Sequence, residues 1–240
     1  MTNNKYLPGR IRMVKTPSQH GTIPPLANGD KLNRYEFEHR YNAMPDSKKA
    51  ELIEGIVYMG AALRFKSHSQ PHAWIMVWLG TYATLTPHVT LGVEPTVRLD
   101  LDNEPQPDAV LLIDRKAGGQ ARLSEDDYIE GAPELIVEIA ASSVAIDLHA
   151  KKQAYRRNGV KEYLVWQVLD QKFSWFYLER GEYVELSADS NGILSSQIFP
   201  GLWLAVNELF AGNMQQVLTI LQTGLQSDEH SEFVNQLTSK

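Results

Sequence analysis

Two acidic residues stand in surroundings where an ionised carboxylate is costly. Glu138 lies in the run Glu134–Ala140, which is apolar on both faces when its side chains alternate. Such a strand is normally buried, and a buried carboxylate needs a cationic partner. Asp108 follows Pro107 at the head of a second apolar strand. Together the two acids could hold Mg²⁺ or Mn²⁺; the alternative for Glu138 is a structural salt bridge.

Lys151 is expected to face the sheet that carries these two acids. A helix is expected over about residues 146–158, and at roughly 100° per residue Lys151 falls within its apolar arc, beside Leu148 and Tyr155. It therefore points at the sheet. Lys151 could form an i,i+4 pair with Asp147, worth only about 0.3–0.5 kcal/mol, or it could reach Glu138 and Asp108 from the neighbouring element.

The other side of this helix is basic. Residues 147–163 contain five lysines and arginines against two acids, which reverses the charge of the whole chain. Lys152, Arg156 and Arg157 carry most of this charge. They indicate either a phosphate-facing patch or an ordinary solvated face, and both interpretations stay open.

Two further acids are candidates for the same site. Glu51 and Glu54 lie on opposite faces of a strand or hairpin expected over residues 51–59, so one of them could complete a carboxylate cluster. His68 and His72 are four apart, as two ligands on a helix would be, but Pro71 lies between them. We do not expect this pair to bind a metal.

The elements that position these residues alternate between strands and helices around one core, which indicates a mixed-sheet α/β domain. A buried helix is expected over residues 72–85 and another helix over 207–221, which could pack on its own core or on a second copy of the chain. Strands are expected at 89–93, 96–101, 107–113, 134–140, 162–168, 172–178 and 182–186.

Composition limits the function classes. The chain has 240 residues, no cysteine, and 29 acidic against 23 basic side chains. The missing cysteines exclude disulfides, thiolate-bound metals and a cysteine nucleophile. The net charge of −6 argues against a histone-like nucleic-acid binder, though not against a nuclease. No run approaches the ~20 apolar residues of a membrane span, so we expect a cytoplasmic protein without membrane contact.

Seven short motifs in order resemble the Uma-two family of restriction-endonuclease-like proteins, within the PD-(D/E)XK nuclease superfamily. The likeness covers about residues 31–211, with residues 1–30 as an N-terminal arm and 212–240 as a helix end and polar tail. The motifs are Glu51-Leu-Ile-Glu-Gly55, His72, Gln106-Pro-Asp108, Glu134-Leu-Ile-Val-Glu138, Asp147-Leu-His-Ala-Lys151 with Tyr155, Gly159-Val-Lys-Glu-Tyr163 and Phe199-Pro-Gly201.

The resemblance implies a restriction-endonuclease-like core, a mixed central β-sheet flanked by helices, and Mg²⁺- or Mn²⁺-dependent hydrolysis of phosphodiester bonds, with DNA as the expected substrate. Asp108 and Glu138 match the family's metal-binding acids, and Glu51 matches its first acid, ahead of Glu54. The superfamily's usual lysine position holds Ala140 here, and Lys151 matches a lysine moved to the next helix. His72 would support the site or contact a phosphate.

Other functions remain possible on the same sequence. A catalytically inactive nuclease-like fold could serve as a nucleic-acid-binding or protein-interaction module, because fold alone does not fix function. The acids and Lys151 could also be a purely structural ion-pair cluster. Nucleases that cut duplexes often pair two sites, so a homodimer is a further expectation.

Overall fold

A six-stranded mixed sheet forms the centre of the molecule, in the order β11-β10-β9-β8-β5-β3. The computed structural model describes residues 23–45 and 49–239. Only β8 and β9 pair in parallel; the other neighbours are antiparallel. The strands are β3 (Val89–Val93), β5 (Ala109–Ile113), β8 (Leu135–Ala140), β9 (Glu162–Gln167), β10 (Lys172–Glu179) and β11 (Glu182–Glu185).

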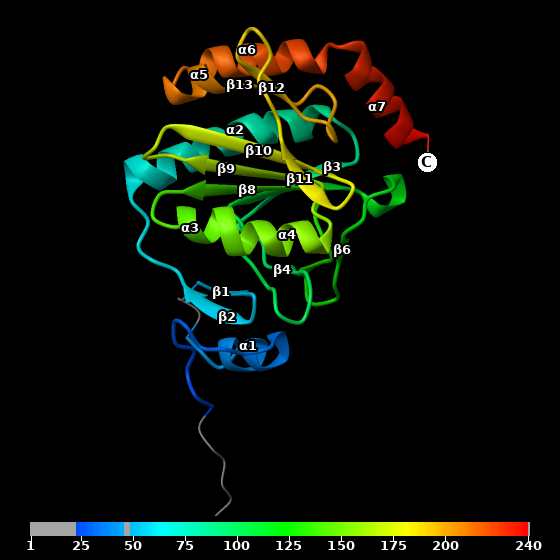
Figure 1. The fold of residues 1–240 in the computed structure, drawn as a ribbon. Coiled ribbons are helices and arrows are strands. Elements are labelled where there is room, and N and C mark those ends of the chain that lie inside the picture. Colours follow the sequence, from blue (N-terminus) through cyan, green and yellow to red (C-terminus); the bar gives the residue numbers. More distant parts are fainter. Residues whose placement is uncertain (1–22, 46–48, 240) are drawn as a thin grey trace, which may run out of the picture.

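Helices cover both faces of this sheet (Figure 1). On one face lies α2, with α5 and α6 beyond it; on the other lies a continuous helical stretch that follows β8. The expectation of a mixed sheet flanked by helices is confirmed. The helices of these layers are α2 (Gln70–Leu85), α3 (Val144–Ile146), the π-helical turn η3 (Asp147–Lys151), α4 (Lys152–Asn158), α5 (Val206–Phe210) and α6 (Met214–Leu225).

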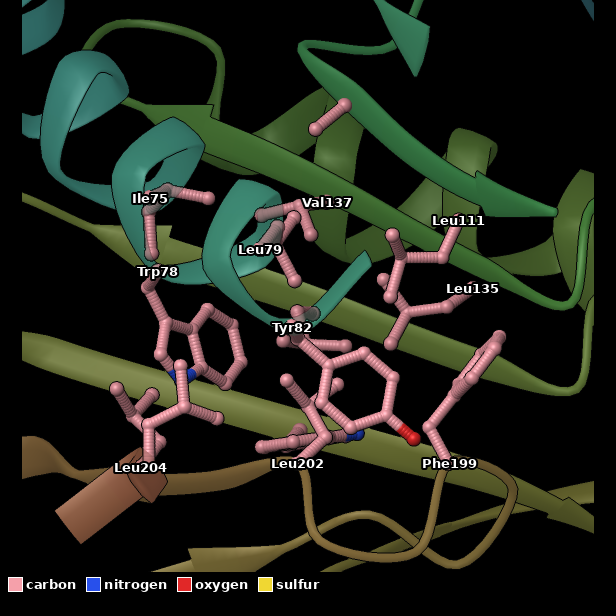
Figure 2. Close-up of a cluster of buried hydrophobic side chains, with 14 of the residues drawn as sticks. Ile75, Trp78, Leu79, Tyr82, Leu111, Leu135, Val137, Phe199, Leu202 and Leu204 are labelled. Carbon is pink, nitrogen blue, oxygen red and sulfur yellow. The ribbon is translucent and has the colours of Figure 1, made fainter. Parts of the chain in front are cut away.

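The main hydrophobic core lies between α2 and the sheet. Figure 2 shows Ile75, Trp78, Leu79 and Tyr82 of α2 packed over Leu111, Leu135 and Val137 of the central strands. The second face of β8 contributes Ile136 and Ala140 to a smaller core with Tyr155 of α4. Both faces of β8 are therefore buried, and Glu138 lies on the α4 side.

Smaller elements surround this frame. The hairpin expected near Gly55 forms from β1 (Ala50–Ile53) and β2 (Ile56–Met59), and α1 (Arg34–Tyr41) precedes it. The strand expected at 96–101 is only the two-residue β4 (Val97–Arg98). The rest are the π-helical turn η1 (Phe65–Ser69), the 3₁₀ turn η2 (Arg115–Ala117), β6 (Arg122–Leu123), β7 (Ile129–Glu130), β12 (Ile193–Ser195) and β13 (Trp203–Ala205).

The C-terminal part differs from the expectation of a single helix and a polar tail. The expected helix is divided by a turn at Gly212, whose φ is +74°, and α6 then starts from an Asn213 cap. Residues expected to be a tail form α7 (Asp228–Thr238), capped by Ser227. Leu209, Val217 and Leu221 are buried in the chain's own core, the first of the two packing alternatives. Most of the expected N-terminal arm, residues 1–22, lies outside the described residues.

None of the helices in the described ranges is long and apolar enough to cross a bilayer.

Close packing of α6 against the Pro200-Gly201 turn gives a testable result. A Cβ at Gly224 would overlap the carbonyl oxygen of Gly201 and lie 2.9 Å from the Trp203 ring. Gly224→Ala should therefore destabilise the protein by about 1–3 kcal/mol. Gly80→Ala in α2 is the matched control, because its Cβ would make an ordinary 3.6 Å contact with Leu91 and should stabilise slightly. Equal unfolding midpoints in urea for the two variants would contradict this packing.

Candidate active site

Glu138 is a buried carboxylate whose partners come from the helix after its own strand. One carboxylate oxygen, Oε1, accepts hydrogen bonds from Lys151 Nζ at 3.0 Å and from the Tyr155 hydroxyl at 2.8 Å. The side chain is only 5% exposed. The Glu138 carboxylate, which would be costly to ionise alone in an apolar strand, is thus paired with Lys151 and hydrogen-bonded by Tyr155.

Lys151 lies at the centre of three carboxylates and faces the sheet, as its helical-wheel position predicts. Its Nζ is 2.9 Å from Glu51 Oε1, 3.0 Å from Glu138 Oε1 and 3.7 Å from Asp147 Oδ1. Asp147 and Lys151 open and close the π-helical turn η3, a feature that is frequent at functional sites. The i,i+4 pair with Asp147 and the contact with Glu138 therefore exist together, whereas the expected contact of Lys151 with Asp108 is not among the ion pairs of the described residues.

Glu51 and Glu54 are separated by the hairpin turn. Glu51 Oε1 also accepts a 2.7 Å hydrogen bond from the backbone N–H of Gln106, so Glu51 ties β1 to the segment leading to Asp108. Glu54 lies in the turn, is exposed, and pairs with Arg157 at 2.5 Å. Of the two, only Glu51 contacts Lys151.

Asp108 reaches the site from the start of β5. The β5–β8 register pairs Ala109 with Val137, so Asp108 comes opposite Glu138. Its Oδ2 accepts a 2.6 Å hydrogen bond from the backbone N–H of Ile139. The two acids predicted from separate strands are thus brought to the same level of the sheet by strand pairing.

His68 is the residue that sequence reasoning missed. Its Nδ1 donates to the carbonyl oxygen of Ile139 at 3.1 Å, and its Nε2 lies 3.3 Å from Asp108 Oδ1 without the alignment of a hydrogen bond. His72 Nε2 lies 3.1 Å from the carbonyl oxygen of Asp108. Both histidines contact protein atoms at the site, and their four-residue spacing was the one signal that could have included His68.

Burial and the neighbouring charges together shift the pKa values of the site. Burial raises the pKa of Glu138 well above its usual value, and the charges of Asp147, Asp108 and Glu51 add to the effect of burial, against Lys151. Burial also raises the pKa of Asp147. Burial alone would lower the pKa of Lys151, but the surrounding carboxylates raise it. Burial opposes ionisation of Asp108, yet the adjacent His68 ring and the hydrogen bond from the backbone N–H of Ile139 lower its pKa.

The basic side chains of α4 have partners within the protein. Lys152 Nζ lies 3.4 Å from the centre of the Phe176 ring, Arg156 bonds to the Gly181 carbonyl oxygen and Glu182, and Arg157 pairs with Glu54. These contacts compete with binding to phosphates. The helix is neither a free basic patch nor a face open only to water.

Comparison with known proteins now decides the family. A family model named Uma2, described as "Putative restriction endonuclease", matches residues 34–207. The chain belongs to the Uma2 family. The resemblance drawn from the seven motifs is confirmed.

A solved structure has a similar fold. The crystal structure of "a putative nuclease belonging to DUF820" from Anabaena variabilis matches with a TM-score of 0.55 at 14% sequence identity, covering 72% of this chain and 96% of that chain. At this identity the likeness establishes the fold alone. No curated protein matches. Family and fold together support a nuclease-like function.

The Uma2 assignment implies a divalent metal ion, and the residues present fit one. Both carboxylate oxygens of Asp147 are buried without a hydrogen-bond partner in the described part of the chain, and three carboxylates surround Lys151. No three His, Cys, Asp or Glu side chains of the described residues form a preformed ligand group. Mg²⁺ commonly uses only one or two protein carboxylates, with water and substrate phosphate completing its shell.

Proposed function

We propose that this protein is a metal-dependent endonuclease that hydrolyses phosphodiester bonds in nucleic acid, with DNA as the expected substrate. The observation that carries the proposal is the buried pair of Glu138 and Lys151, with Asp108 beside it from the adjacent strand. Three carboxylates share the single ammonium group of Lys151, and the oxygens of Asp147 have no hydrogen-bond partner in the described residues, so the site holds more carboxylates than the lysine can neutralise. An acidic site of this kind favours a divalent cation.

Asp108 and Glu138 are the residues that would hold one or two Mg²⁺ or Mn²⁺ ions. Bound there, such an ion would lower the pKa of water and neutralise charge on the scissile phosphate. Lys151 carries a fixed positive charge beside Glu138, where it can orient water or stabilise charge that develops on the phosphate. Its neighbours fix its position because they contact Nζ directly.

Glu51 supports positioning more than direct metal binding. Its Oε1 is shared between Lys151 and the backbone N–H of Gln106, so it holds both the lysine and the segment carrying Asp108. The other carboxylate oxygen of Glu51 could still bind a metal ion, and this role is part of the proposal. His72 would help to position Asp108, because its ring contacts the carbonyl oxygen of that residue.

A cleavage assay tests the proposed activity. Supercoiled plasmid and single-stranded DNA should be nicked or cut by the wild-type protein with Mg²⁺ or Mn²⁺, and EDTA should stop the reaction. Binding to both DNAs without cleavage under any divalent ion would instead support the inactive binding module. That second candidate is favoured by one observation, namely that Lys151 already occupies the centre of the carboxylate cluster.

Contact between α4 and phosphates is part of the same proposal. Replacing Lys152, Arg156 and Arg157 together by glutamine should weaken DNA binding and flatten its salt dependence, since each phosphate contact releases counterions. Fluorescence anisotropy at several salt concentrations measures both quantities. If the affinity and its salt dependence are unchanged, these side chains contact only their partners within the protein.

A homodimer and a cytoplasmic location also remain predictions, which sedimentation analysis and cell fractionation would test.

A further inference from the structure

A short basic and aromatic segment leads into the candidate active site. Residues 61–67 join β2 to α2 and read Ala-Ala-Leu-Arg-Phe-Lys-Ser. Phe65 is 68% exposed and Leu63 60%, and the cations of Arg64 and Lys66 flank the aromatic ring in sequence. Neither cation takes part in an ion pair with any described residue. The exposed ring and the two available positive charges offer a stacking surface with anion-binding groups on either side.

The end of this segment is fixed to the carboxylates. Phe65 opens the π-helical turn η1, which continues into α2 and carries His68 to Ile139 and Asp108. In Figure 1 the chain from β2 runs along the side of the molecule to α2, at the edge where β8 ends and α3 begins. Phe65 is thus three residues from a side chain that contacts the site. A ligand strand lying on the segment would continue towards Asp108.

The chemistry of the segment matches a nucleic-acid strand. Bases stack on aromatic rings, and phosphates on either side of a base attract lysine and arginine. The segment contains no acidic residue, whereas Leu169, an equally exposed apolar residue, is followed by Asp170 in a turn between β9 and β10. The basic residues of α4, in contrast, are engaged with partners inside the protein.

We propose that residues 61–67 hold the substrate strand at the site, with Phe65 stacked on an unpaired base and Arg64 and Lys66 on the adjacent phosphates. This inference rests on the proposed function in that the ligand is a nucleic acid. Its test therefore measures binding, so that it can fail while cleavage persists.

The experiment is anisotropy of a fluorescent single-stranded DNA oligonucleotide, with the full chain in EDTA to prevent cleavage. Phe65→Ala should weaken binding at least about fivefold, the lower end of the effect of one stacked base, with the salt slope unchanged. Phe65→Tyr should retain wild-type affinity because its ring still stacks. The double variant Arg64→Gln/Lys66→Gln should weaken binding and reduce the salt slope by about 1.4, since each single-strand phosphate contact contributes roughly 0.7.

Matched controls separate the segment from general surface effects. Leu169→Ala removes an equally exposed apolar side chain. Lys116→Gln/Lys161→Gln removes two charges at the end of the sheet that lies away from Asp108 and Glu138, because Lys116 follows β5 and Lys161 precedes β9. Both should bind as the wild type does. If Phe65→Ala and the double variant also bind like the wild type, the proposal is wrong while the proposed function stands. A larger loss on duplex than on single-stranded DNA would overturn the unpaired-base contact. A wild-type protein that binds no DNA in EDTA would overturn the role of the segment, while cleavage with Mg²⁺ or Mn²⁺ still decides the proposed function.

Discussion

Replacing Lys151 by methionine is expected to destabilise the folded protein by roughly 3–5 kcal/mol at neutral pH, the cost of removing one partner from a buried ion pair. Methionine keeps the length of the side chain but leaves Glu51, Glu138 and Asp147 without the ammonium group they surround. Urea unfolding measures the change. Lys152→Met is the matched control, because that side chain is only partly buried over Phe176 and should cost about 1 kcal/mol or less.

The same variant should show a specific pH dependence. Burial already raises the pKa values of Glu138 and Asp147, and losing Lys151 would raise them further. A carboxyl group whose pKa is higher in the folded than in the unfolded state takes up protons on folding, so its contribution to stability is lost as pH rises. The defect of Lys151→Met should therefore shrink as pH falls from neutral towards about 4.5. If Lys151→Met is as stable as the wild type, or is destabilised equally at all pH values, the carboxylates do not depend on Lys151 for neutralisation.

Replacing Glu138 by glutamine should abolish cleavage with little loss of stability. We expect a fall of more than about a hundredfold in rate, since even residues that only support a metal ligand cost ten- to a hundredfold. Lys151 keeps its contacts with Glu51 and Asp147, so stability should change by about 1 kcal/mol or less. The wild type should be stabilised by Mg²⁺ through mass action, and the variant should lose this response.

Glu134→Gln provides the comparison for that experiment. Glu134 immediately precedes the same strand, and its buried carboxylate accepts hydrogen bonds from the backbone N–H groups of Ile113 and Gln120. That variant should be destabilised but keep the Mg²⁺ response. If instead Glu138→Gln is destabilised by several kcal/mol and the wild type ignores Mg²⁺, the cluster is a structural salt bridge.

Much of the fold could be predicted from local pattern. The strand around Glu138 is apolar on both faces and is the central β8, and the buried helix 72–85 matches α2 within two residues. Lys151 was predicted to face the sheet because its neighbours on the helix are apolar. The C-terminal helix α7 escaped prediction since its sequence is mostly polar, and only a few of its side chains, such as His230 and Leu237, are buried.

The parts of the site that depend on long-range pairing could not be predicted. His68 reaches Asp108 because a π-helical turn places it there, 40 positions earlier in the chain, and no local pattern specifies that turn. The internal partners of Arg156 and Arg157 come from the β10–β11 turn and the β1–β2 hairpin. These contacts follow from how distant elements pack, and the basic composition of α4 could not reveal them.

The central claim is that Asp108, Glu138 and Lys151 form the site of a divalent-metal-dependent nuclease. Plasmid cleavage by wild type and Glu138→Gln, purified side by side and assayed with Mg²⁺ or Mn²⁺, tests it most directly. The account predicts cleavage by the wild type and none by the folded variant, which also excludes a contaminating nuclease. Equal cleavage by both proteins, or none by the wild type with either ion, would contradict it.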